Sequence, residues 1–282
     1  SGSAAADTAA VGSMLIPSML KNGYPRGLAA VIQACAGSLG PIIPPSLTMI
    51  IYCSLTGLSI GECFMAGVIP GLIIGLGVAV VTYFYARRLG IKGDERVPYR
   101  ERLTAIKDGI LAIIMPLIII GGIVSGIFTP TESGAIAVIY ALVIGMFVYK
   151  EFTYRELPRI FLKAASMTGM ALLIVAGASI FSWLVAYEKF PKMIITFLTG
   201  LTDNKYVIMM LLVLFLLFVG MFIETLSATI ICAPILMPVA AQYGIDPIQF
   251  ALIMVITLVY AGVTPPVGGV LFITMGIAKA KM

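Results

Sequence analysis

The sequence predicts an all-α protein that crosses a membrane several times. Of its 282 residues, 60% are hydrophobic and only 11% are charged, and the mean hydropathy is +1.09. A soluble domain covers its core with roughly a quarter charged residues, so lipid is the expected solvent for most of this surface. A second observation, an internal repeat marked by glycine and proline, predicts inverted repeats. Each repeat is expected to hold a re-entrant hairpin and a broken transmembrane helix.

Apolar runs of about 20 residues give the expected spans in order. They cover residues 27–56 with an interruption at 40–45, then 66–87, 108–128, 134–149, 164–187, 206–223, and 247–277 with an interruption at 262–266. Two shorter apolar segments, 4–20 and 227–242, are expected to be re-entrant or buried, because they are too short to span comfortably.

The basic residues indicate the orientation of the chain. Seven Lys and Arg residues fall within 87–107 and four within 150–163, both of them short connections between apolar runs. This is the positive-inside pattern, so we expect both loops to be cytoplasmic. The net charge of +5 is therefore explained without a nucleic-acid partner.

The composition also limits the chemistry that the chain can perform. It has no histidine, which removes Ser/His and Cys/His nucleophile pairs and most zinc sites. The cysteines form no CxxC pair and are expected to fill helix interfaces; they are Cys35, Cys53, Cys63 and Cys232. We therefore expect no enzyme activity, no catalytic residue and no organic cofactor.

The internal repeat appears when the segment that begins at Leu15 is aligned, without gaps, with the segment that begins at Leu236. The alignment pairs Pro17 with Pro238, Gly23 with Gly244, Pro44 with Pro265, Pro45 with Pro266, Leu15 with Leu236, Ala30 with Ala251, and Ile32 with Ile253. Four of these seven identities are Gly or Pro, the residues that determine backbone shape. Five expected spans separate the two copies, so the second copy is predicted to be upside down.

Inverted repeats with broken helices are the sequence signature of secondary transporters. A break exposes backbone carbonyls and amides at membrane depth, which is tolerated only where they line an enclosed site. The expected hairpin tips, 1–7 and 224–229, are rich in small and hydroxyl residues. We expect a transport domain from 1–57 and 206–282, which moves as an elevator against scaffold and connecting helices in 58–205.

Two further patterns are assigned structural roles. Glu132 follows Thr129 at a helix start, where it is expected to act as a cap. Gly67, Gly71 and Gly75 recur every four residues, which lets neighbouring helices approach closely.

Several motifs resemble the large membrane subunit of tripartite ATP-independent periplasmic (TRAP) transporters. They are residues 2–7 (GSAAAD), 40–46 (GPIIPPS), 129–133 (TPTES), 234–238 (PILMP) and 262–268 (GVTPPVG). The resemblance extends over essentially the whole chain, but the family's N-terminal scaffold helices and last helix are absent, so we expect a fragment. It implies sodium-driven uptake of an organic acid across the bacterial inner membrane. Its implied partners are a periplasmic substrate-binding protein and a small membrane subunit.

The breaks and tips supply the candidate site residues. One Na⁺ is expected between the first tip and first break, at Ser1, Ser3, Gly40, Ile42 and Pro45. A second is expected at Thr225, Ser227, Gly262, Thr264 and Pro266. The substrate carboxylate is expected between the tips, with Ser3, Asp7, Pro45, Ser46, Glu224, Thr225 and Pro266 as candidate contacts. No Lys or Arg is available there, so bound Na⁺ would supply the positive charge.

Other functions are left open by the sequence. A single-component sodium/dicarboxylate or citrate carrier shares the same hairpin and broken-helix logic. An intramembrane aspartyl protease would need Asp7 and Glu224 to face each other. A purely structural subunit would need no binding site. The sequence does not choose among a C4-dicarboxylate, sialic acid or a keto acid, and it does not give the number of sodium ions.

Overall fold

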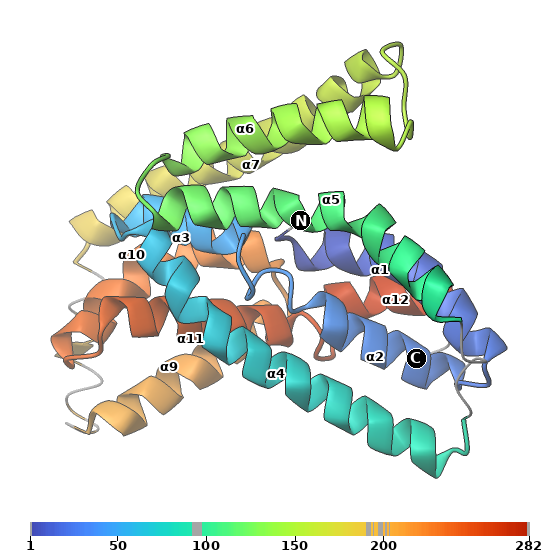
Figure 1. The fold of residues 1–282 in the computed structure, drawn as a ribbon. Coiled ribbons are helices and arrows are strands. Elements are labelled where there is room, and N and C mark those ends of the chain that lie inside the picture. Colours follow the sequence, from blue (N-terminus) through green and yellow to red (C-terminus); the bar gives the residue numbers. More distant parts are fainter. Residues whose placement is uncertain are drawn as a thin grey trace. The chain divides into compact units, whose positions relative to one another are not determined.

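The computed structural model describes residues 2–91, 98–189, 193, 195–196, 200, 202 and 204–280, and the regular elements of this part are helices (Figure 1). The predicted all-α fold is therefore confirmed. Contacts divide the chain into two compact units, each of which is treated separately below. The first comprises Ser1–Asp94 with Phe181–Met282, and the second comprises Glu95–Ile180. The predicted functional boundaries at 58 and 206 stay a prediction.

The N-terminal part of the first unit contains the first predicted repeat. Its helices are α1 (Ala4–Lys21), α2 (Arg26–Gly37), α3 (Leu47–Thr56) and α4 (Ile60–Arg88). The predicted break lies at 38–46, between α2 and α3. The chain re-enters a helix where the Ser46 hydroxyl accepts a hydrogen bond from the Met49 amide at 3.2 Å. Such N-caps satisfy the amides that a helix start leaves unpaired.

The second repeat has the same helical pattern. Its helices are α9 (Lys205–Gly220), α10 (Thr225–Gln242), α11 (Pro247–Ala261) and α12 (Gly269–Ala278). The repeat alignment, extended towards the N-terminus, places both ends of α1 on both ends of α10. Each of these helices is followed by a glycine of positive φ, Gly23 at 90° and Gly244 at 67°. The second break lies at 262–268, and the peptide bonds Pro44–Pro45 and Pro265–Pro266 are both cis.

The two repeats pack against each other reciprocally. α12 of the second repeat packs against α1 and α2, while α3 of the first repeat packs against α10 and α11. In Figure 1, α1, α2 and α12 form one group and α3, α10 and α11 form the other. Helix α1 therefore packs against α12, the second half of the second broken helix. In the same way, α10 packs against α3, the second half of the first broken helix. Neither repeat is a self-contained packing unit.

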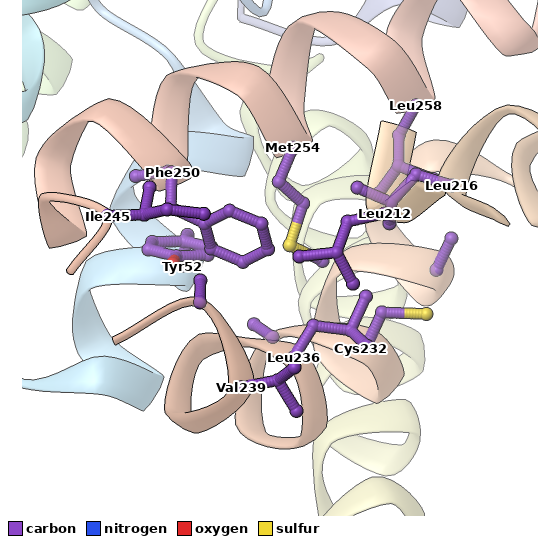
Figure 2. Packing of buried hydrophobic residues seen from close by; sticks show 14 of the residues in the cluster. Tyr52, Leu212, Leu216, Cys232, Leu236, Val239, Ile245, Phe250, Met254 and Leu258 are labelled. Carbon is purple, nitrogen blue, oxygen red and sulfur yellow. The ribbon is translucent and has the colours of Figure 1, made fainter. Parts of the chain in front are cut away.

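A hydrophobic core joins α3, α9, α10 and α11 (Figure 2). Its large members include Tyr52, Leu212, Leu216, Leu236, Val239, Phe250, Met254 and Leu258. Lipid tails are as apolar as these side chains, so inside a membrane the cluster stabilises the unit mainly through close packing. It holds the second hairpin rigidly behind its tip.

The glycines of α4 pack where the sequence predicts. A β-carbon at Gly67 would lie 2.8 Å from the Met49 Cε, and one at Gly71 would lie 2.6 Å from the Ile43 Cγ1. At Gly75 the nearest atom, Leu39 Cδ1, would be 3.4 Å away. The predicted packing role is confirmed, because α4 lies against the first break and α3 through this glycine face.

The second unit contains α5 (Tyr99–Val124), α6 (Pro130–Val143), the π-helical continuation η1 (Ile144–Val148) and most of α7 (Leu157–Tyr187). α5 packs against α6, and the Tyr140 hydroxyl donates to the Leu111 carbonyl at 2.8 Å. The predicted Glu132 cap is confirmed as one half of a capping box. Its Oε2 accepts from the Thr129 amide at 2.8 Å, and the Glu132 amide donates to the Thr129 hydroxyl at 3.3 Å.

The predicted loop bounds need correction. Helix α4 continues to Arg88 and α5 begins at Tyr99, so helical residues occupy both ends of the predicted loop 87–107. Helix α7 begins at Leu157, inside the predicted loop 150–163. Charged residues continue these helices because Lys and Arg are good helix formers and extend into the interface.

Three helices in the described part are long and apolar enough to cross a membrane: α4, residues Pro130–Val148, and α10. Only 17% of the apolar window of α4 and 11% of that of Pro130–Val148 is buried, whereas 50% of the α10 window is buried. Side chains such as Ile69 and Leu76 of α4 are well exposed, as expected for a helix that faces lipid. α10 is the most buried of the three, and its predicted re-entrant or buried character stays a prediction.

Candidate functional site

The first hairpin tip lies directly against the first break. Gly2 has φ +75°, and a β-carbon there would lie 2.7 Å from the Pro45 carbonyl oxygen and 2.8 Å from the Leu47 amide nitrogen. Only glycine satisfies both the backbone angle and the close approach. The neighbouring Ser3 occupies the N-cap position of α1 without a side-chain capping bond. Ser1, the other predicted ligand of this tip, lies outside the described residues.

Asp7 and Thr8 extend this contact along α1. A β-carbon at Gly40 would overlap the Asp7 Oδ2, and one at Gly37 would overlap the Thr8 hydroxyl. Thr8 is fully buried and its hydroxyl has no hydrogen-bond partner within the described chain. The first turn of α1 therefore brings a carboxylate and a hydroxyl against the end of α2.

The predicted site groups of the first break differ in whether they form hydrogen bonds. Among the described residues, no hydrogen bond is made to the carbonyl oxygens of Gly40, Ile42 and Pro45. The Ser46 hydroxyl, by contrast, is engaged twice: it donates to the Pro41 carbonyl and accepts from the Met49 amide. Ser46 therefore acts as a structural cap of α3, whereas the three carbonyls have the bonding capacity of cation ligands.

The second tip is held by its own cap. Glu224 Oε2 accepts from the Leu226 amide at 2.9 Å and from the Ser227 amide at 3.2 Å, which makes Glu224 the N-cap of α10. Thr225 is buried, and its hydroxyl lies 3.5 Å from the Leu258 carbonyl of α11. The tip is thereby attached to the helix that precedes the second break.

In the second break, some of the predicted ligand groups have hydrogen-bond partners and others do not. The Gly262 carbonyl accepts from the Val270 amide at 3.1 Å, so the end of α11 bonds to the start of α12. The Thr264 hydroxyl donates to the Tyr260 carbonyl at 3.0 Å. For the Thr264 and Pro266 carbonyls, the described part of the chain supplies no donor. Of the predicted ligand carbonyls in the second break, only that of Gly262 accepts a backbone hydrogen bond from the described residues.

A cavity of about 300 Å³ connects the two repeats inside the first unit. Its lining comprises Ala4, Ala5, Gly220, Met221, Phe222, Ile223, Glu224, Thr225, Gly262, Val267, Gly269, Val270 and Ile273. The predicted residues Glu224, Thr225 and Gly262 meet here. Ser3, Asp7, Pro45, Ser46 and Pro266 are not among the lining residues, although Ser3 directly precedes Ala4.

Helix ends give this cavity its electrostatic character. The N-termini of α1, α10 and α12 reach it at Ala4, Thr225 and Gly269, and the C-terminal ends of α9 and α11 reach it at Gly220 and Gly262. Helix N-termini present amides and about half a positive charge, whereas C-termini present carbonyls. The cavity thus presents both amide donors and carbonyl acceptors, and no Lys or Arg is among its described lining residues.

Two buried threonines were not among the predicted site residues: Thr8 and Thr229, its equivalent in the second repeat. The repeat alignment pairs these two residues, and both are fully buried. Thr229 donates to the Thr225 carbonyl at 2.8 Å, while Thr8 faces Gly37. The repeat alignment could have found this pair of threonines. It was missed because both residues precede the aligned segments, which begin at Leu15 and Leu236.

Comparison with known proteins places these features in a family. The family model for the tripartite ATP-independent periplasmic transporter, DctM component, matches residues 1–282. The C4-dicarboxylate TRAP transporter large permease protein of Pseudomonas aeruginosa is 39% identical over 98% of this chain and 65% of its own length. The sialic acid TRAP transporter large permease protein of Vibrio cholerae is 37% identical over 97% of this chain and 64% of its own length.

A third relative is a longer protein. The isethionate TRAP transporter permease protein DctMQ of Oleidesulfovibrio alaskensis is 38% identical over 100% of this chain and 45% of its own length. The chain therefore spans less than two thirds of the length of these three relatives.

Proposed function

This chain belongs to the family of DctM components of tripartite ATP-independent periplasmic transporters, and we propose that the complete protein takes up an organic acid by sodium-coupled symport. The main support for this proposal is the cavity between the repeats. The N-termini of three helices and the C-termini of two helices meet there. The same cavity has room for a small solute and lies against both the second tip and the start of the first hairpin arm.

The anion would bind at the helix N-termini of the cavity. Amides at the starts of α1, α10 and α12 and the Thr225 hydroxyl are the donors available to a carboxylate. Each helix end contributes about half a charge at most, which is weak compensation for a desolvated anion. The negative Glu224 at the rim adds repulsion, so the anion needs an additional positive charge.

Bound sodium would supply that charge. The first ion is assigned to Ser1, Ser3, Gly40, Ile42 and Pro45, and the second to Thr225, Ser227, Gly262, Thr264 and Pro266. Support for the first site comes from the contact of Gly2 with Pro45 and from carbonyls without protein donors among the described residues. Support for the second comes from Thr225 and Gly262, which line one cavity. Because each ion raises the affinity for the anion, the two would be transported together.

The substrate class follows from this charge pattern. The named relatives act on a C4-dicarboxylate, sialic acid and isethionate, all small organic acids. For this protein we propose a carboxylate as the anchoring group, which C4-dicarboxylates and sialic acid carry; isethionate carries a sulfonate instead. A periplasmic binding protein would deliver the substrate to the outer face of the bacterial inner membrane. A small membrane subunit would be the second partner, which the name DctMQ of one relative supports.

Reciprocal packing supports an elevator movement. α12 packs with the first hairpin and α3 with the second, so neither repeat can move without the other. The hairpins and broken helices would move together as a rigid body and expose the cavity to each side in turn.

The test is uptake into proteoliposomes that contain the complete protein, its small subunit and its binding protein. A panel of radiolabelled acids is offered with and without an inward sodium gradient. We expect uptake of one acid class that requires both sodium and the binding protein. Uptake without the binding protein would favour a single-component carrier, and absence of sodium-dependent binding and uptake in the full assembly would favour a structural subunit.

A further inference from the structure

An apolar groove of about 710 Å³ lies between α2 and α4 of the first unit. Gly27 and Val31 line its α2 wall, Gly77 and Val81 line its α4 wall, and Tyr260 of α11 completes the lining. No heavy atom lies within 4 Å of a β-carbon built at Gly27 or at Gly77. The groove is therefore open at both glycines, and none of the lining residues is charged.

The length of the groove matches one leaflet of a bilayer. Its α4 wall runs from Ile74 to Tyr85, a rise of about 16 Å at 1.5 Å per residue. Half of a typical hydrocarbon core is about 15 Å. The groove is also narrow, because α2 and α4 contact each other directly. A protein helix is about 10–12 Å across, so it could enter the groove only if α2 and α4 moved apart. An extended acyl chain is thinner and could enter without that movement.

Two arginines stand close in sequence to lining residues of the groove, although neither is itself a lining residue. Arg26 directly precedes Gly27, and Arg88 lies three residues after Tyr85, on the same face of α4. Both side chains are exposed, and within the described residues neither forms an ion pair with an acidic side chain. Arg26 donates one hydrogen bond, to the Lys279 carbonyl at 3.1 Å, which leaves other guanidinium donors available.

The charge pattern selects the ligand. The positive-inside rule places Arg26 and Arg88 at the cytoplasmic surface, where anionic phospholipids are concentrated. We propose that the groove binds one anionic phospholipid, with an acyl chain between α2 and α4 and its phosphate at Arg26 and Arg88. The lipid would fill the space between the first broken helix and the long helix that follows it.

The experiment uses native mass spectrometry of the complete protein, delipidated and then titrated with phosphatidylglycerol or phosphatidylcholine. We expect one phosphatidylglycerol to bind more tightly than phosphatidylcholine. The double variant Arg26→Gln/Arg88→Gln should weaken phosphatidylglycerol binding about 30-fold, roughly fivefold for each arginine, and remove the headgroup preference. The control Arg155→Gln/Arg159→Gln removes two exposed arginines that are separated in sequence from the groove-lining residues, and it should leave binding unchanged.

A second variant tests the acyl chain independently of charge. Gly77→Phe fills the groove and should abolish the bound lipid, whereas Gly121→Phe, at a glycine with equally open surroundings on α5, should not. Retention of the lipid by Gly77→Phe, or equal binding of the two headgroups by the unmodified protein, would overturn the proposal. Density for a protein helix in this groove of the complete assembly would do the same.

Discussion

The carboxylate of Asp7 lies so close to Gly40 that a β-carbon at Gly40 would overlap its Oδ2. Asp7 belongs to the first turn of α1, and Gly40 belongs to the first broken helix. The contact therefore places the Asp7 carboxylate against the Cα side of Gly40, at the start of the first break. The sodium site proposed above would place its cation at this contact, and the first prediction tests that proposal.

Gly40→Ala should disturb this arrangement directly. The added methyl group would push Asp7 away from the break, and we expect at least a tenfold loss of sodium-dependent uptake, corresponding to about 1.4 kcal/mol or more. The measurement is the sodium concentration dependence of uptake in proteoliposomes. The matched control Gly134→Ala, where a β-carbon has no neighbour within 4 Å, should behave as the unmodified protein. Equal sodium dependence in both variants would disprove a role for this contact.

A comparison of Gly2→Ala with Gly23→Ala distinguishes the cost of backbone strain from the cost of steric contact at the first tip. Gly2 and Gly23 both have positive φ, but only at Gly2 would an added methyl group also collide with neighbouring atoms, those of Pro45 and Leu47. Gly23→Ala should cost about 1 kcal/mol from strain alone, and Gly2→Ala should cost more because it separates tip from break. Thermal unfolding of both variants gives the comparison. A smaller loss of stability for Gly2→Ala would contradict the close tip contact.

Thr225→Ala tests the second tip. The variant removes a buried hydroxyl that lies beside the Leu258 carbonyl and lines the cavity. We expect the sodium concentration for half-maximal uptake to rise about tenfold, the effect of roughly one lost ligand interaction, with normal membrane insertion. Thr225→Ser should restore most of the affinity. Thr56→Ala is the control, since the Thr56 hydroxyl donates within its own helix to the Tyr52 carbonyl at 2.8 Å. An equal change there would mean a non-specific effect.

Glu156 gives a pH dependence to the turn before α7. Hydrogen bonds from the Thr153 amide at 2.8 Å and hydroxyl at 3.0 Å lower the pKa of Glu156 below its ordinary value of 4.5. A depressed pKa stabilises the folded turn above about pH 4.5, and this contribution is lost as the pH falls through the lower folded-state value. Protection factors for hydrogen exchange at 153–157, after correction for the intrinsic pH dependence of amide exchange, should therefore fall on acidification. Thr153→Ala and Glu156→Gln should each reduce that dependence, and an unchanged profile in both would refute the cap.

The sequence by itself determined the features that depend on local chemistry. The apolar composition indicates membrane helices, and glycine and proline mark where helices end, because these residues restrict or free the backbone wherever they occur. The repeat alignment therefore predicted matching helices, and α1 and α10 have matching bounds. The Thr129–Glu132 capping box was predictable for the same reason, since its partners lie within one helical turn of each other.

Only the tertiary structure decided which distant groups meet. Ser46 and Glu224 were candidates for substrate contact, and in the fold both cap helices, with Glu224 also lining the cavity. Asp7 meets Gly40 and Thr8 meets Gly37 across about 30 residues of sequence. The cavity joins the N-terminus of α1 to those of α10 and α12, at opposite ends of the chain. Such contacts depend on how helices pack against each other. The periodicity of apolar residues along one helix shows which face is buried, but it does not identify the helix that packs on that face.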